Sequence, residues 1–198
     1  MKLFIAPPSP FARKCRIVVR EKGLTDRVEE LPVNPYESPA ALLAVNPIAQ
    51  VPALLTDDGE AILDSPVICE WLDRHGSGPV LLPVDGPERW RVKRVEGLAS
   101  AVLEMGVKLV LEKRRPESER SPSWIARWIE NMGRALDALE AADIAADPLD
   151  MGVITAGCAV TWLDFRHPDF DWKTGRPGLV ALQAALETRE SFRQTVPA

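Results

Sequence analysis

Ser9 is the first residue of the chain whose type and position suit a chemical role. It follows a short apolar run, residues 2–6, that is typical of a strand, and it precedes Pro10, which favours the first turn of a helix. A serine at this place is typical of a helix N-cap. Its hydroxyl then lies beside unpaired N–H groups at the positive end of the helix dipole, where an anion or a thiolate can bind.

The same Ser-Pro dipeptide begins three other expected helices, at Ser38, Ser65 and Ser121. By itself it indicates only where a helix starts, so Ser9 can also be a structural cap without a ligand. The basic residues of the first helix have two interpretations as well: a face solvated by water, which we favour, or a field that attracts an anion. They are Arg13, Lys14, Arg16 and Arg20.

Val51-Pro52 is the second segment with chemical potential, because it begins a strand directly after a loop. A proline at this point favours a tight turn that is compatible with a cis X-Pro bond. Such a turn would leave the backbone N–H and C=O of Val51 available to pair with an extended peptide, as an added strand does. The structural alternative is an ordinary proline of an edge strand.

Asp64-Ser65 is the third segment, an acidic residue followed by the start of a helix. The hydroxyl and N–H groups at Ser65 can take a carboxylate, and the carboxylate of Asp64 can take an ammonium group. The α-amino acid end of a small molecule carries both charges. The structural alternative is again a cap, with Asp64 favoured by the helix dipole.

The elements that must position these segments alternate between strands and helices over the first 75 residues or so. We expect strands over 2–6, 28–33, 51–56 and 61–63, and helices over 10–22, 38–45 and 65–74. This βαβαββα order predicts a compact α/β domain. Beyond it only helical periodicity is convincing, over residues 88–115 (one long helix or a kinked pair), 121–140, 151–163 and 179–186. We therefore predict an α/β domain at 1–76, a Gly- and Pro-rich linker at 77–87 and an all-α domain at 88–198.

Composition narrows the classes of function. The 198 residues carry a formal net charge of −5, which gives no support for nucleic acid as a partner. No apolar run is long enough for a membrane span, and we expect no signal peptide. The three cysteines and two histidines are scattered without metal-ligand spacing, so we expect no metal site and no disulfide framework. The simplest location is a reducing cytosol.

Four motifs together resemble the glutathione S-transferase family. They are Ser9-Pro10-Phe11, Asn46-Pro47-Ile48-Ala49-Gln50-Val51-Pro52-Ala53-Leu54, Asp64-Ser65-Pro66-Val67-Ile68 and Ala159-Val160-Thr161-Trp162-Leu163-Asp164-Phe165-Arg166. The resemblance extends over essentially the whole chain. It implies a thioredoxin-like N-terminal domain, a helical C-terminal domain and a homodimer. One departure is Asp150-Met151-Gly152-Val153, which keeps a helix cap but lacks the reciprocal acid of a capping box.

The resemblance also implies a glutathione site. Ser9 would be the catalytic residue, donating a hydrogen bond to the glutathione sulfur. The backbone of Val51, next to a cis Pro52, would pair with the cysteinyl part, and Asp64 and Ser65 would hold the γ-glutamyl end. The remaining candidate contacts are Phe11 and, at the glycyl end, Gln50.

The implied activity is attack by the thiolate of glutathione on a small hydrophobic electrophile, as in detoxification. No cysteine stands at position 9, and Cys15 lies on another side of the helix, so thiol–disulfide exchange through an enzyme cysteine is disfavoured. The second domain would supply the electrophile pocket, from residues such as Val102, Met105, Lys108 and Trp162. Two alternatives stay open: a non-catalytic scaffold with this fold, and a glutathione-dependent peroxidase.

Overall fold

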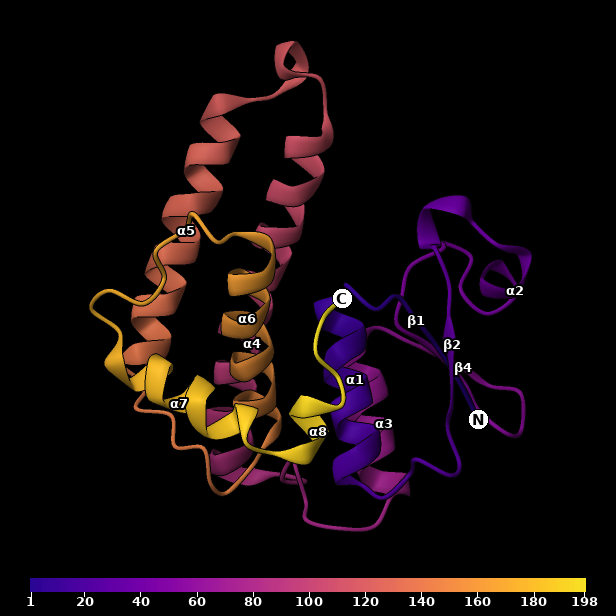
Figure 1. The fold of residues 1–198 in the computed structure, drawn as a ribbon. Helices are drawn as coiled ribbons and strands as arrows, with labels where there is room; N and C mark the ends of the chain where they lie inside the picture. Colours follow the sequence, from indigo (N-terminus) through magenta and orange to yellow (C-terminus); the bar gives the residue numbers. More distant parts are fainter. The chain divides into compact units, whose positions relative to one another are not determined.

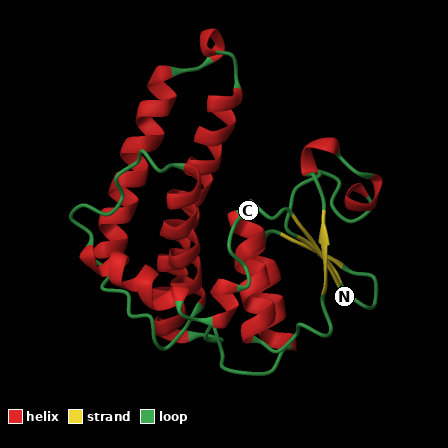
Figure 2. Ribbon diagram, viewed as in Figure 1, coloured by secondary structure: helices red, strands yellow, loops and turns green.

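The chain folds into two units, which a computed structural model describes over all residues, 1–198. The first unit comprises Met1–Leu82 together with Arg189–Ala198, and the second comprises Pro83–Thr188. Strands occur in the first unit alone, and the second consists of helices joined by loops (Figures 1 and 2).

The first unit has the predicted βαβαββα order, with one added turn of 3-10 helix. The elements within Met1–Leu82 are β1 (Lys2–Ile5), α1 (Pro10–Glu21), β2 (Glu29–Pro32), η1 (Pro35–Glu37), α2 (Ala40–Leu43), β3 (Ala53–Leu55), β4 (Ala61–Leu63) and α3 (Ser65–His75). The sheet order is β2-β1-β3-β4; β1 pairs with β2 in parallel, and the other two pairs are antiparallel. The predicted fold class of this unit is therefore confirmed.

Alternating side chains of β1 divide the core of the first unit into two layers. Phe4 packs with Leu42, Val45 and Ala53, so its face of the sheet is covered by α2. Leu3 and Ile5 point to the opposite face because successive side chains of a strand alternate, and both are buried. That face is the one on which α1 and α3 lie (Figure 1). Helices therefore cover both faces of the sheet, and the ends of its strands are left available to form a site.

The second unit is built on three long helices. Its elements are α4 (Gly86–Arg114), η2 (Glu117–Glu119), α5 (Pro122–Glu140), α6 (Met151–Arg166) and α7 (Pro177–Glu187). The run predicted as a helix buried on all sides is α6, in which the ten residues from 151 to 160 are all buried. Its predicted cap is present, because the backbone N–H of Val153 donates to Asp150 Oδ1 at 2.8 Å. None of the helices combines the length and apolar character that crossing a membrane requires.

Close approach of α4 and α6 depends on Gly152. A Cβ at this position would lie 2.9 Å from Val95 Cβ and 3.0 Å from the carbonyl oxygen of Val92. We expect Gly152→Ala to lower the free energy of unfolding by about 1 to 2 kcal/mol, because overpacking outweighs the gain in helix propensity. Gly97→Ala on α4 is the matched control, since its Cβ would meet nothing within 4 Å. Urea unfolding that left both variants at or above the wild-type stability would contradict this account.

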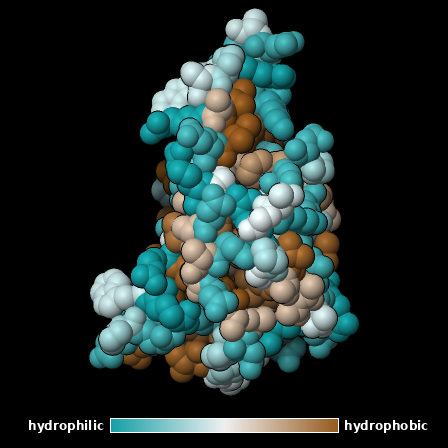
Figure 3. All heavy atoms as spheres, turned by 90° about the vertical axis from the view of Figure 1, so that its left-hand side faces the viewer, coloured by the Kyte–Doolittle hydropathy of each residue, from teal (hydrophilic) through white to brown (hydrophobic).

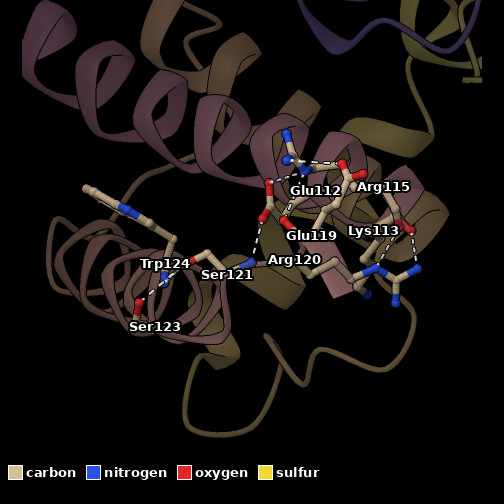
Figure 4. Close-up of polar contacts among 8 residues, drawn as sticks. All are labelled: Glu112, Lys113, Arg115, Glu119, Arg120, Ser121, Ser123 and Trp124. Atoms are coloured by element: carbon tan, nitrogen blue, oxygen red, sulfur yellow. Dashed lines mark hydrogen bonds and ion pairs between the residues drawn. The ribbon is translucent and has the colours of Figure 1, made fainter. Parts of the chain in front are cut away.

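The connection between α4 and α5 is held by polar contacts, which Figure 4 shows. Arg120 donates to the carbonyl oxygens of Arg115 and Lys113, at 2.9 and 2.8 Å. The backbone N–H of Ser121 donates to Glu112 Oε1 at 2.8 Å. The side of the molecule that carries α5 and α7 is largely hydrophilic, with separate apolar areas (Figure 3).

His167, at the end of α6, is a buried imidazole in the second unit. It contacts the ring of Trp162 edge-on, and its Nε2 lies 3.0 Å from the carbonyl oxygen of Gly106. Burial lowers the pKa of His167 from its ordinary value of 6.5, and the hydrogen bond to Gly106, which acts in the opposite direction, does not offset it. The charges of Lys113 and Arg166 lower this pKa further.

This lowered pKa makes stability depend on pH below neutrality. Between the folded pKa of His167 and 6.5, the unfolded chain binds a proton that the folded chain does not. The contribution of neutral His167 to the free energy of unfolding is therefore fully present above pH 6.5 and is lost as the pH falls through the pKa of the folded state. We expect the free energy of unfolding, measured by urea denaturation, to decrease as the pH is lowered from about 7 to about 5.5, by at most about 1.4 kcal/mol per pH unit. His167→Gln should flatten this slope, and equal slopes in the two proteins would refute the assignment.

Arg13 and Lys14 correct one prediction, because they do not lie on a solvated face. Each is 1% exposed. The guanidinium of Arg13 lies 5.4 Å from the ring centre of Phe192 and donates to its carbonyl oxygen at 3.3 Å. The next two basic residues of α1, Arg16 and Arg20, form ion pairs with Glu30 on β2 at 2.7 and 2.6 Å. The end of the chain therefore covers Arg13, and Arg16 and Arg20 are paired with the sheet.

The last ten residues correct a second prediction, since they group with the first unit and not with the helical region. The segment includes a short helix, α8 (Glu190–Arg193). Glu21 on α1 pairs with Arg189 at 3.0 Å and accepts a hydrogen bond from Ser191 Oγ at 2.5 Å. Burial raises the pKa of Glu21, but these hydrogen bonds outweigh burial and hold the pKa below its ordinary value. The periodicity of a four-residue helix is too short to indicate which unit it joins.

Candidate functional site

The register of the sheet brings the three predicted segments to one edge. Phe4 of β1 lies opposite Ala53 of β3, and Ala53 lies opposite Leu63 of β4. β1 runs past this edge toward Ser9, β3 begins there after Val51-Pro52, and β4 leaves there into Asp64-Ser65. The end of β1, the start of β3 and the end of β4 therefore lie at the same end of the sheet, because β1 and β4 are both antiparallel to β3.

Ser9 occupies the N-cap position of α1, with Pro10 at the first helical position as predicted. Its Oγ accepts a hydrogen bond from the backbone N–H of Ala12 at 3.2 Å. A serine hydroxyl has one donor and two acceptor positions, so this contact leaves the O–H able to donate to a ligand. Phe11 lies in the same first turn and is half-buried. The first turn of α1 can therefore present a hydroxyl donor and a positive helix end together.

The Val51–Pro52 peptide bond is cis, and Pro52 is buried. Strand pairing begins only at Ala53, so the backbone N–H and C=O of Val51 lie outside the ladder. Val51 itself is half-buried, and the side chain of Gln50 before it is exposed. The segment can accordingly offer one backbone donor and one backbone acceptor to an extended ligand.

Asn46, the first residue of the motif that contains Val51-Pro52, holds the loop before that segment in place. It is buried, and both the nitrogen and the oxygen of its side-chain amide form hydrogen bonds within the loop that precedes Val51. Its Nδ2 donates to the carbonyl oxygen of Gln50 at 2.8 Å, and its Oδ1 accepts from the N–H of Ile48 at 3.2 Å. The signal available in the sequence was an asparagine between a helix and a proline, which commonly caps its own loop.

Asp64 and Ser65 lie where β4 passes into α3. Asp64 has a positive φ of 69°, a conformation that aspartate tolerates better than most residues, and its exposed side chain makes no capping hydrogen bond. Ser65, by contrast, is 3% exposed. The carboxylate is therefore available to a cation at the same helix start where N–H groups favour an anion.

Residues expected to form an electrophile pocket lie in the second unit and differ in exposure. Val102 and Trp162 are buried in its core, Trp162 against Gly106, whereas Met105 is half-buried and Lys108 is exposed. Nothing in this arrangement assigns them to one pocket. The unit also has an open hollow of about 640 Å³ at the start of α4, whose lining includes Trp90, Arg91 and Arg94. No group of three or more His, Cys, Asp or Glu side chains is arranged to hold a metal ion.

Two family models match the chain. The glutathione S-transferase N-terminal domain matches residues 8–75, and the glutathione S-transferase C-terminal domain matches residues 122–182. The first match contains all three segments, Ser9-Pro10, Val51-Pro52 and Asp64-Ser65.

Individual relatives agree with these matches. The GST-like protein YibF of Escherichia coli K12 is 37% identical over 202 residues, which is 100% of this chain and 98% of its own. Maleylacetoacetate isomerase of Pseudomonas aeruginosa is 33% identical over 71% of this chain and 68% of its own. A glutathione transferase family member from Pseudomonas fluorescens Pf-5, solved with bound glutathione, superposes with a TM-score of 0.95 and 34% identity, covering 100% and 98% of the two chains. Domain matches and full-length similarity lead to one conclusion: the chain belongs to the glutathione S-transferase family.

Proposed function

We propose that this protein is an enzyme that binds glutathione at the sheet edge and uses its thiolate as a nucleophile. The register that joins the ends of β1 and β4 to the start of β3 is the observation that carries the proposal. In the proposed complex, Asp64 binds the ammonium group of the γ-glutamyl end, and Ser65 binds the carboxylate of the same end. The backbone of Val51 pairs with the cysteinyl residue, and Ser9 donates to the sulfur. Glutathione bound to the P. fluorescens relative supports this choice of ligand.

The chemistry needs a lowered thiol pKa, and the start of α1 has the groups to lower it. A thiol with a pKa near 8.5 is mostly protonated at neutral pH, whereas the thiolate is the nucleophile. A decrease of about two pKa units requires roughly 2.7 kcal/mol of preferential stabilisation of the thiolate. One hydroxyl donor contributes about 1 to 3 kcal/mol and a helix N-terminus about 0.3 to 2 kcal/mol. Ser9 acts here as a hydrogen-bond donor and not as a base.

Conjugation to a small hydrophobic electrophile is the reaction we favour. Phe11, two residues after Ser9, and Gln50, next to Val51, complete the proposed glutathione contacts. The homodimer is part of the same proposal and rests on the family resemblance, and the proposed cytosolic location rests on the three scattered cysteines.

Isomerisation is a second candidate, favoured by the similarity to a maleylacetoacetate isomerase. A thiolate that adds to an activated double bond creates a single bond that can rotate, and its elimination then regenerates free glutathione. Conjugation and isomerisation therefore share the thiolate and differ in whether glutathione stays in the product. A peroxidase and a non-catalytic scaffold are further alternatives, and the experiment below distinguishes all four.

The test incubates the protein with glutathione and three probes: an aryl halide, a cis-unsaturated dicarboxylic acid and an organic hydroperoxide. Mass spectrometry then identifies the products. A glutathione adduct supports conjugation, a trans isomer without adduct supports isomerisation, and glutathione disulfide supports a peroxidase. Binding without turnover of any probe would support the scaffold and contradict the enzyme proposal.

A further inference from the structure

We propose that Cys15 and Cys69 form a reversible disulfide when the protein meets peroxide, and that this disulfide weakens glutathione binding. The expected effect on glutathione binding rests on the proposed function, whereas the formation of the disulfide does not.

The two thiols are neighbours in the core of the first unit. Cys15 lies on α1, Cys69 lies on α3, and their sulfur atoms are 3.6 Å apart. Both side chains are completely buried as thiols. A disulfide has a sulfur–sulfur distance of about 2.05 Å, so the sulfurs must approach by about 1.5 Å. Packing of α1 against α3 keeps the two cysteines in contact although 54 positions separate them in the chain.

The dithiol is connected to both helix starts that build the proposed site. Cys15 lies on the helix that Ser9 caps, and its Sγ lies 3.9 Å from the carbonyl oxygen of Ser65. Cys69 lies one turn after Ser65 on α3. A sulfur–sulfur bond would draw α1 and α3 together and move Cys15 relative to Ser65. Because a displacement near 1 Å at a binding group can be costly, we expect about tenfold weaker binding.

The oxidation balances with hydrogen peroxide as the oxidant. One thiol attacks peroxide and becomes a sulfenic acid, releasing one water. The second thiol then displaces the sulfenic hydroxyl, forming the sulfur–sulfur bond and releasing a second water. Two thiols are thus oxidised by two electrons, and one peroxide is reduced to two waters. Complete burial means that peroxide must enter through local opening of the helices, so the reaction is expected to be slow.

The experiment treats the full-length protein with peroxide, blocks remaining thiols and searches the digest for a peptide linking Cys15 to Cys69. The thiol count in denaturant should fall from three to one, because two of the three cysteines are consumed. Binding is measured with S-methylglutathione, whose blocked sulfur cannot reduce the disulfide. We expect about tenfold weaker binding after oxidation, with full recovery in dithiothreitol.

Variants separate the disulfide from other damage. In Cys15→Ala and in Cys69→Ala, the affinity for S-methylglutathione should be the same before and after peroxide treatment. In Cys158→Ala, which alters α6, the affinity should decrease after peroxide as it does in the wild type. Absence of the linked peptide would overturn the disulfide. A linked peptide with unchanged affinity would overturn its effect on the site. Failure of the reduced protein to bind S-methylglutathione would instead overturn the proposed function, and the linked peptide would still be observable.

Discussion

Ser9→Ala should lower kcat/KM for glutathione-dependent turnover by about 10- to 100-fold, the effect of removing one hydrogen bond to a charged sulfur. Glutathione affinity should change much less, because the variant keeps every proposed contact to the two ends of the tripeptide. The pH profile supplies a second readout: the pKa of activity should rise toward that of the free thiol, near 8.5. Steady-state kinetics across pH measures both.

The control for this variant must remove a helix cap without touching the site. Ser9 accepts a hydrogen bond from the N–H of Ala12, so its loss also costs about 1 kcal/mol of stability. Ser121 caps α5 in the same way, accepting from the N–H of Trp124. Ser121→Ala should show a comparable loss of stability with unchanged kcat/KM. Equal losses of activity in both variants would mean that Ser9 acts only as a cap.

Asp64→Asn should weaken glutathione binding by about 10- to 100-fold, the range for a charge-assisted hydrogen bond. The substitution removes the negative charge that would pair with the ammonium group of the γ-glutamyl end. Asparagine also tolerates the positive φ of 69° at this position, so the backbone should be kept. Calorimetric titration measures the affinity.

Asp85→Asn is the matched control. Asp85 precedes α4 as Asp64 precedes α3, and neither side chain makes a capping hydrogen bond. The control should bind glutathione as the wild type does. The role of Asp64 would be refuted by wild-type affinity in Asp64→Asn, or by the same loss in both variants.

Local sequence signals predicted most of the fold. Proline after serine marked the starts of α1, α3 and α5, and the apolar run at 151–163 indicated a helix buried on all sides. These signals work because caps and periodicity act within a few residues. The same locality allowed Ser9, Val51 and Asp64 to be singled out as candidates from the sequence alone.

Features that depend on long-range packing were not predictable. Arg13 appeared solvated because helical spacing cannot show that Phe192, 179 positions later, covers it. Cys15 and Cys69 appeared scattered because only the packing of α1 on α3 brings their sulfurs together. Likewise, asparagine before a loop suggests a cap, but the two hydrogen bonds of Asn46 follow from the path of the whole loop.

The most direct test of the central claim is a titration of glutathione into the wild-type protein, with the ultraviolet absorbance of the thiolate followed against pH. We predict that glutathione binds and that its thiol ionises about two pH units below the free value near 8.5. In Ser9→Ala the bound thiol should ionise closer to the free value. No binding at millimolar glutathione, or a bound thiol with an unchanged pKa in the wild type, would contradict the account.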